Sequence, residues 1–232
     1  KHIRKPSSDG LLMPDEYCAR EILQLFSMGE YRTIISGDLV RDRAGKMLQN
    51  YTNEDIKELA RVFTGLRYSG NSTNLHDPME MNSNNHDFDE KVFPNLRLTL
   101  PPRTPSASEG NAEINEAIDH IFEHPNVGPY IARILIQRLV KANPSTTYIR
   151  DVATAFNDNG QGQRGDLLAV VRAILLHREA LRSQRYQRIR SGGSITGLRV
   201  KTKGTEHCKL VEPLVRYTQF IKSFGGQPVD SS

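Results

Sequence analysis

A histidine and an aspartate are adjacent at His86 and Asp87, and a similar pair, His76 and Asp77, precedes them. Imidazole and carboxylate groups bind several divalent metals, and a carboxylate can orient an imidazole by accepting its second N–H. The His86–Asp87 pair could therefore hold a divalent metal cofactor, or supply a general base for a hydrolase-like reaction. The alternative is that these side chains cap turns, with Lys91 pairing with Asp87.

Three further residues could contribute to such a site. His124 follows His120 by four residues, but Pro125 ends the helical spacing there, which favours His124 satisfying a turn over joint metal ligation. Glu21 and Arg138 lie in two predicted helices, and Arg138 belongs to a helix that is apolar nearly all round. A buried guanidinium needs a partner, so Glu21 and Arg138 predict either an internal ion pair or a clamp for an anion.

A run of arginines follows these candidates along the chain. Residues 164–203 hold ten Lys or Arg and two acids, within a chain whose net charge is +4. The arginines in question are Arg178, Arg182, Arg185, Arg188 and Arg190. On a helix they would form a basic face for nucleic acid phosphates or another acidic polymer, which is the basis of a non-catalytic binding or scaffold function. The alternative is a solvated face without a partner.

Composition places the chain in the soluble, globular class. It has 232 residues, of which 37% are hydrophobic and 25% charged, and it contains two cysteines. No apolar run is long enough for a membrane span, and no targeting signal is visible. Cys18 shares a helical stripe with Ile22 and Leu25, which predicts a buried thiol, while a disulfide with Cys208 stays open.

Hydrophobic periodicity predicts several helices and no alternation of strands with helices. The expected helices cover about 14–28, 52–66, 114–123, 127–142, 148–156, 167–175 and 210–224. Thr52 with Asp55 resembles a capping box at the start of the second helix. The helix over 127–142 is expected to be the central, most buried one.

The remaining segments are expected to interrupt one helical domain. Residues 31–51 predict a small β-hairpin insertion around the Asp42–Gly45 turn, and residues 69–108 a long irregular loop. Residues 183–204 are expected to form a basic linker containing Gly and Ser. The predicted fold class is therefore all-α, a multi-helix bundle-like domain with a small hairpin insertion.

Several stretches, in order along most of the chain, carry a family resemblance. They are residues 14–29, the Tyr51-Thr52 pair, residues 60–65, His86-Asp87 with Lys91, and residues 124–129, 138–140, 143–145 and 209–216. In these motifs the chain resembles the domain-of-unknown-function 1800 family. The glycine usual soon after the His-Asp-Lys motif is replaced here by Phe93-Pro94-Asn95.

The resemblance implies a large, mainly helical protein, mostly bacterial and often exported, with no established activity. Family members are much longer, so the chain is expected to be an internal piece of such a protein. The resemblance names no catalytic residue, cofactor or partner.

Overall fold

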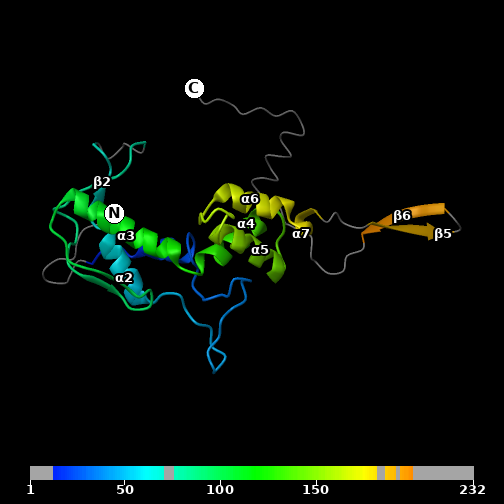
Figure 1. The fold of residues 1–232 in the computed structure, drawn as a ribbon, viewed down its shortest axis with the longest axis horizontal. Coiled ribbons are helices and arrows are strands. Elements are labelled where there is room, and N and C mark those ends of the chain that lie inside the picture. Colours follow the sequence, from blue (N-terminus) through cyan, green and yellow to red (C-terminus); the bar gives the residue numbers. More distant parts are fainter. Residues whose placement is uncertain (1–12, 71–75, 182–185, 192–193, 201–232) are drawn as a thin grey trace.

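The computed structural model describes residues 13–70 and 76–181, together with the backbone of residues 186–191 and 194–200. The described chain is mainly helical, with short antiparallel strands inserted between the helices (Figure 1). Predictions that fall on Cys208 and on the helix over 210–224 lie outside the described residues.

Seven helices and six strands make up this part of the chain. The helices are α1 (Tyr17–Gln24), α2 (Asn53–Val62), α3 (Ala107–Glu123), α4 (Val127–Leu139), α5 (Thr146–Asn157), α6 (Leu167–Leu176) and α7 (Arg178–Leu181). The strands are β1 (Leu66–Arg67), β2 (Glu80–Met81), β3 (Lys91–Phe93), β4 (Leu98–Leu100), β5 (Tyr186–Ser191) and β6 (Ser194–Val200). Each strand pairs antiparallel with its neighbour, which gives three two-stranded sheets.

Local signals determine where several helices begin. The Thr52 hydroxyl accepts from the Asp55 backbone N–H, and the Asp55 carboxylate accepts from the Thr52 N–H, which completes the predicted capping box of α2. Asp166 caps α6 in a similar way, accepting from the N–H groups of Leu168 and Ala169. These caps satisfy amide groups that the first helical turn leaves without partners.

The helices form two neighbouring groups that share one apolar core (Figure 1). In one group α2 packs against α1, α3 and the β3–β4 hairpin, and in the other α4, α5 and α6 pack together. Core side chains come from both groups, among them Leu23, Leu59, Ile136, Tyr148 and Ile174. The helix α4 is less enclosed than its sequence predicts, because Leu139 is half exposed.

Two predicted segments differ from expectation. The hairpin predicted at 31–51 is a meander of three short legs, joined by the isolated bridges Tyr31–Gln49, Thr33–Leu39 and Arg41–Met47. The loop predicted at 69–108 is only partly irregular, because it contains β2, β3, β4 and the first residues of α3. Strands of two or three residues are too short to produce a recognisable alternation of polar and apolar residues.

The basic segment is also not the linker that was predicted. Residues 186–191 and 194–200 pair as the β5–β6 hairpin, which lies apart from the helices in Figure 1. The prediction of a continuous helical face of arginines is therefore wrong, because α7 ends at Leu181 and positions 188 and 190 belong to a strand. Cys18 also differs from its prediction, since it is exposed.

Among the described helices, none is both long and apolar enough to cross a membrane.

Candidate functional site

His86 lies in a buried polar cluster that joins the β3–β4 hairpin to α3. We call this cluster, made of Thr64, His86, Asp87, Lys91 and Glu113, the Lys91 network. The Lys91 ammonium is fully buried and donates to the Asp87 carbonyl (2.6 Å), the Asp89 carbonyl (3.0 Å) and Glu113 Oε1 (2.9 Å). All three of its N–H groups are therefore satisfied, as a buried ammonium requires.

Both ring nitrogens of His86 are engaged within the same network. Nε2 lies 2.8 Å from Glu113 Oε2, and Nδ1 lies 2.8 Å from the Thr64 carbonyl oxygen. The ring is almost fully buried. A metal ion could bind His86 only after one of these bonds is broken, so a divalent metal at His86 and Asp87 stays a prediction.

Asp87 pairs with an arginine that the sequence did not single out. Arg61 Nε donates to Asp87 Oδ2 at 2.7 Å, and Arg61 also pairs with Glu58 at 2.6 Å. Burial is the largest single influence and would raise the pKa of Asp87, but the bond from Arg61, the Asp89 backbone N–H and the charges of Arg61 and Lys91 together hold the pKa below its ordinary value. The predicted pairing with Lys91 occurs through the backbone carbonyl of Asp87 rather than through its carboxylate.

The Lys91 network fixes one end of the β3–β4 hairpin, and other contacts fix its turn. The backbone N–H groups of Asn95 and Leu96 lie 3.2 and 3.4 Å from Asp55 Oδ1. His120 Nε2 lies 2.8 Å from the Leu96 carbonyl oxygen, which it can reach only as a donor. The turn is therefore held between the start of α2 and the end of α3.

A pocket of about 460 Å³ lies beside this turn, and we call it the histidine pocket after His120 and His124. Its other lining residues come from the 31–50 meander, the hairpin turn and the junction between α3 and α4. Arg32, Arg97, His120, His124 and Glu123 are its titratable residues. The lining therefore carries two guanidinium groups and two imidazoles against one carboxylate.

The two arginines of this pocket are available to a ligand. Arg32 donates through Nε to the Gln49 carbonyl at 3.1 Å, which leaves its two terminal nitrogens. Arg97 is exposed, and its backbone has a φ of 57°. Within residues 13–70 and 76–181, the structure records no carboxylate partner for either side chain. Both guanidinium groups therefore keep donors free at the pocket.

His124 is held as a neutral ring with a defined tautomer. Its Nδ1 accepts from the backbone N–H of Asn126 at 3.2 Å, so the proton of the neutral ring is on Nε2. Burial, followed by the positive charges of Arg32, His120 and Arg164, lowers the pKa of His124 to about 4. At neutral pH this residue is a hydrogen-bond donor through Nε2 without a charge.

Asn126 anchors the meander to the start of α4. Its Nδ2 donates to the Met28 and Tyr31 carbonyls at 2.6 and 3.2 Å, and its Oδ1 accepts from the Thr33 N–H at 2.6 Å. Asn126 is 3% exposed. Asn126 is at the N-cap position of α4, but its side chain makes these long-range contacts and does not cap the helix. These contacts place Arg32 in the pocket.

The remaining predicted site residues are not brought together with His86. Glu21 is in α1, and Arg138 is exposed in the last turn of α4; neither lines the histidine pocket. Arg178 begins α7, Arg182 and Arg185 fall outside the described residues, and Arg188 and Arg190 are in β5. Of the predicted candidates, only His124 lines the pocket with the unpaired arginines.

Sequence reasoning missed Arg32, Arg97 and Glu113. Each gains its role from residues far along the chain, as with the Lys91–Glu113 pair, which is separated by 22 positions. The described residues contain no group of three or more His, Cys, Asp or Glu side chains arranged to hold a metal ion.

Comparison with known proteins gives the family of this chain. A family model described as a protein of unknown function (DUF1800) matches residues 4–214. The chain belongs to the DUF1800 family. No curated protein and no solved structure matches this DUF1800 chain. Assigning a function to it therefore depends on the pocket and its chemistry.

Proposed function

We propose that this DUF1800 chain binds a small anion, a carboxylate or a phosphate, in the histidine pocket. The observation that carries the proposal is that Arg32 and Arg97 line one pocket without a carboxylate partner among the described residues. Guanidinium groups bind carboxylate and phosphate oxygens through paired N–H donors, and the His124 Nε2–H adds a further donor. Glu123 also lines the pocket, but its side chain is 68% exposed, so solvent screens its charge.

Binding is favoured over acid–base catalysis by the state of His124. A general base works best when its pKa lies near the operating pH. The pKa of His124 is lowered to about 4, so the ring is a weak base at neutral pH. The buried His86 ring has no open route to a substrate, because both of its nitrogens are bonded. The hydrolase-like role therefore has less support than a binding role.

Calorimetric titration with inorganic phosphate and with succinate tests the proposal. We expect one of these anions to bind, with an affinity that falls as NaCl is added. The variant Arg97→Gly should weaken binding about tenfold, which corresponds to the loss of one charged contact of about 1.4 kcal/mol.

Arg43→Ala is the matched control, because Arg43 is exposed at the tip of the meander and lines no part of the histidine pocket. This variant should bind as the parent chain does. No binding of either anion at about 10 mM, the weak limit of specific recognition, would show that the proposal is wrong. Equal losses in the two variants would show that only the overall charge matters.

A second candidate is the binding of an acidic polymer or nucleic acid through the arginines at 178–190. The ten basic residues against two acids in 164–203 favour it. Heparin affinity that falls steeply with salt, and that is lost when Arg188 and Arg190 are both changed to Gln, would support this candidate.

A further inference from the structure

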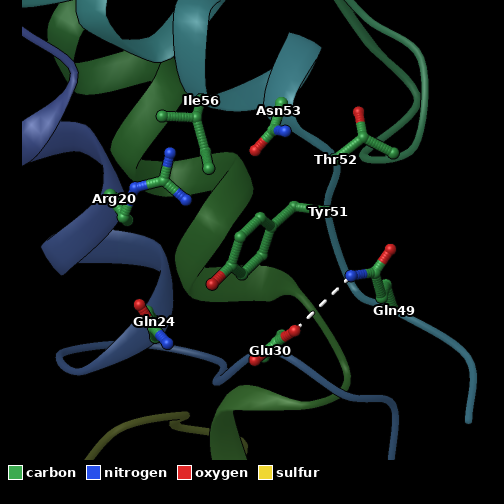
Figure 2. A pocket seen from close by; sticks show the side chains of 8 residues that line it. All are labelled: Arg20, Gln24, Glu30, Gln49, Tyr51, Thr52, Asn53 and Ile56. Atoms are coloured by element: carbon green, nitrogen blue, oxygen red, sulfur yellow. Dashed lines mark hydrogen bonds between the residues drawn. The ribbon is translucent and has the colours of Figure 1, made fainter.

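A second pocket, of about 340 Å³, lies between α1, the start of α2 and the end of the meander. We call it the tyrosine pocket after Tyr51. In Figure 2 the Tyr51 ring is at its centre, with Arg20 and Gln24 of α1 on one side and Gln49 on the other. The two pockets lie on either side of one stretch of backbone. Gln49 and Tyr51 line the tyrosine pocket, and Asn50, between them in the sequence, lines the histidine pocket.

The Tyr51 hydroxyl is the observation that points to a ligand. The residue is 5% exposed, so the ring is packed in the core. Its hydroxyl has no hydrogen-bond partner among the described residues, and it is not one of the buried polar atoms that lack a partner, so it reaches the solvent of the pocket. Tyr148 and Tyr130, in contrast, each donate to a backbone carbonyl at 2.6 Å. Tyr51 therefore presents a free donor and acceptor within the pocket that it lines.

Burial, followed by the nearby Glu30 carboxylate, raises the pKa of Tyr51 to about 12. The hydroxyl therefore keeps its proton across the physiological pH range. A protonated phenol donates one hydrogen bond and accepts others, which suits a ligand group that does the same.

The charges of this pocket balance. Arg20 contributes one positive charge and Glu30 one negative charge, and the other lining residues are neutral. Arg20 pairs only loosely with Glu16, at 3.6 Å, with both side chains more than a third exposed. Solvent screens such a pair, so the guanidinium stays available. A strongly charged ligand gains nothing here, because one of the two groups repels it.

Amide side chains supply most of the remaining polar groups. Gln24, Gln49 and Asn53 each carry a carbonyl acceptor and an NH₂ donor. Gln49 reaches Glu30 Oε1 at 3.5 Å, the outer limit of a hydrogen bond, so both groups can turn to a ligand at little cost. A lining that mixes donors and acceptors in this way matches hydroxyl groups, each of which also donates and accepts.

From this lining we infer that the tyrosine pocket binds a neutral polyhydroxylated ligand, a single sugar residue or the end of a short saccharide. The inference rests on the unpartnered Tyr51 hydroxyl at the pocket, on the three amides and on the balanced charges of Arg20 and Glu30. It is independent of anion binding in the histidine pocket.

Saturation-transfer NMR with D-glucose, D-galactose and N-acetyl-D-glucosamine tests this inference. We expect transfer to at least one sugar and weak binding, with a dissociation constant on the order of 1 mM. Tyr51→Phe removes only the hydroxyl, so the dissociation constant should rise about threefold to tenfold, the usual result of losing one neutral hydrogen bond.

Tyr68→Phe is the matched control, because Tyr68 is 49% exposed and lies outside the pocket. Asn53→Ala, at an exposed position at the start of α2, is a second probe that leaves the core intact, and it should also weaken binding. The inference is overturned if no sugar shows transfer, or if Tyr51→Phe and Asn53→Ala bind as the parent does. It is also overturned if glycine, a zwitterion, displaces the sugar.

Discussion

Arg97 has a backbone conformation that glycine adopts more readily, and it is the non-glycine residue with positive φ in the described chain. The left-handed region costs an ordinary side chain about 1–2 kcal/mol, part of which the greater chain entropy of glycine offsets. We therefore expect Arg97→Gly to raise the free energy of unfolding by about 0.5–1 kcal/mol while it weakens anion binding. Urea unfolding and calorimetry on the same sample would check both effects. A variant less stable than the parent would contradict this account of strain.

The neutral state of His124 makes stability depend on pH. Because the pKa is lowered from 6.5 to about 4, the unfolded chain binds a proton in this window and the folded chain does not. Stability is therefore complete above pH 6.5 and falls as the pH drops towards 4, by about 1–2 kcal/mol after screening at this partly exposed site. His124→Asn keeps an acceptor for the Asn126 N–H and should remove this dependence. Urea unfolding at both ends of the window would measure it, with the exposed His76→Asn as control.

Glu113 is the counter-charge of a fully buried lysine. Glu113→Gln leaves the Lys91 ammonium buried without a carboxylate, which should lower the free energy of unfolding by about 3–5 kcal/mol. Thermal and urea unfolding would measure the loss. Asp119→Asn, at an exposed position on the same helix, should change stability by less than about 0.5 kcal/mol. Similar losses in both variants would mean that the buried charge is not the cause.

At the scale of elements, two glycines allow the cost of an unfavourable backbone conformation to be measured apart from the cost of a packing clash. Gly29 and Gly45 both have positive φ, at 73° and 81°. A Cβ at Gly29 would lie 2.5 Å from the Tyr130 ring, whereas a Cβ at Gly45 would meet no atom within 4 Å. Gly45→Ala should therefore cost about 1 kcal/mol from its backbone alone, and Gly29→Ala at least about 1 kcal/mol more from the clash. Chemical unfolding of both variants would check the difference, and equal costs would rule out a packing contribution.

The sequence predicts elements best where their signals are local. The capping box joins Thr52 to Asp55, three positions apart, and the structure confirms it. The sequence does not predict that Asp55 also holds the β3–β4 turn, 40 positions away. Asn126 shows the same limit, because its type suggests a cap while its contacts reach back 93 to 98 positions. Periodicity cannot reveal contacts that exist only once the helices have packed. For this reason His124 is the one predicted site residue that lines the histidine pocket.

At the scale of the whole molecule, α6 and α7 leave an apolar surface uncovered in the described structure. Leu167, Leu168, Leu175, Leu176 and Leu181 are each about half exposed or more. Such surfaces promote self-association. We expect the double variant Leu168→Gln/Leu176→Gln to change stability by less than about 1 kcal/mol, because neither side chain is in the core. It should remain monomeric at concentrations where the parent associates, as light scattering would show. If the double variant associates as the parent does, a different surface is responsible for self-association.

The order of residues 49 to 51 has a thermodynamic consequence. Gln49 and Tyr51 belong to one pocket and Asn50 to the other, so a single stretch of backbone forms a wall of both. A ligand bound in one pocket reduces the motion of this stretch. A second ligand that binds in the other pocket then loses less conformational entropy and binds more tightly. Linkage then requires each ligand to change the affinity of the other by the same factor. Phosphate titrations with and without sugar would therefore give the same coupling as sugar titrations with and without phosphate.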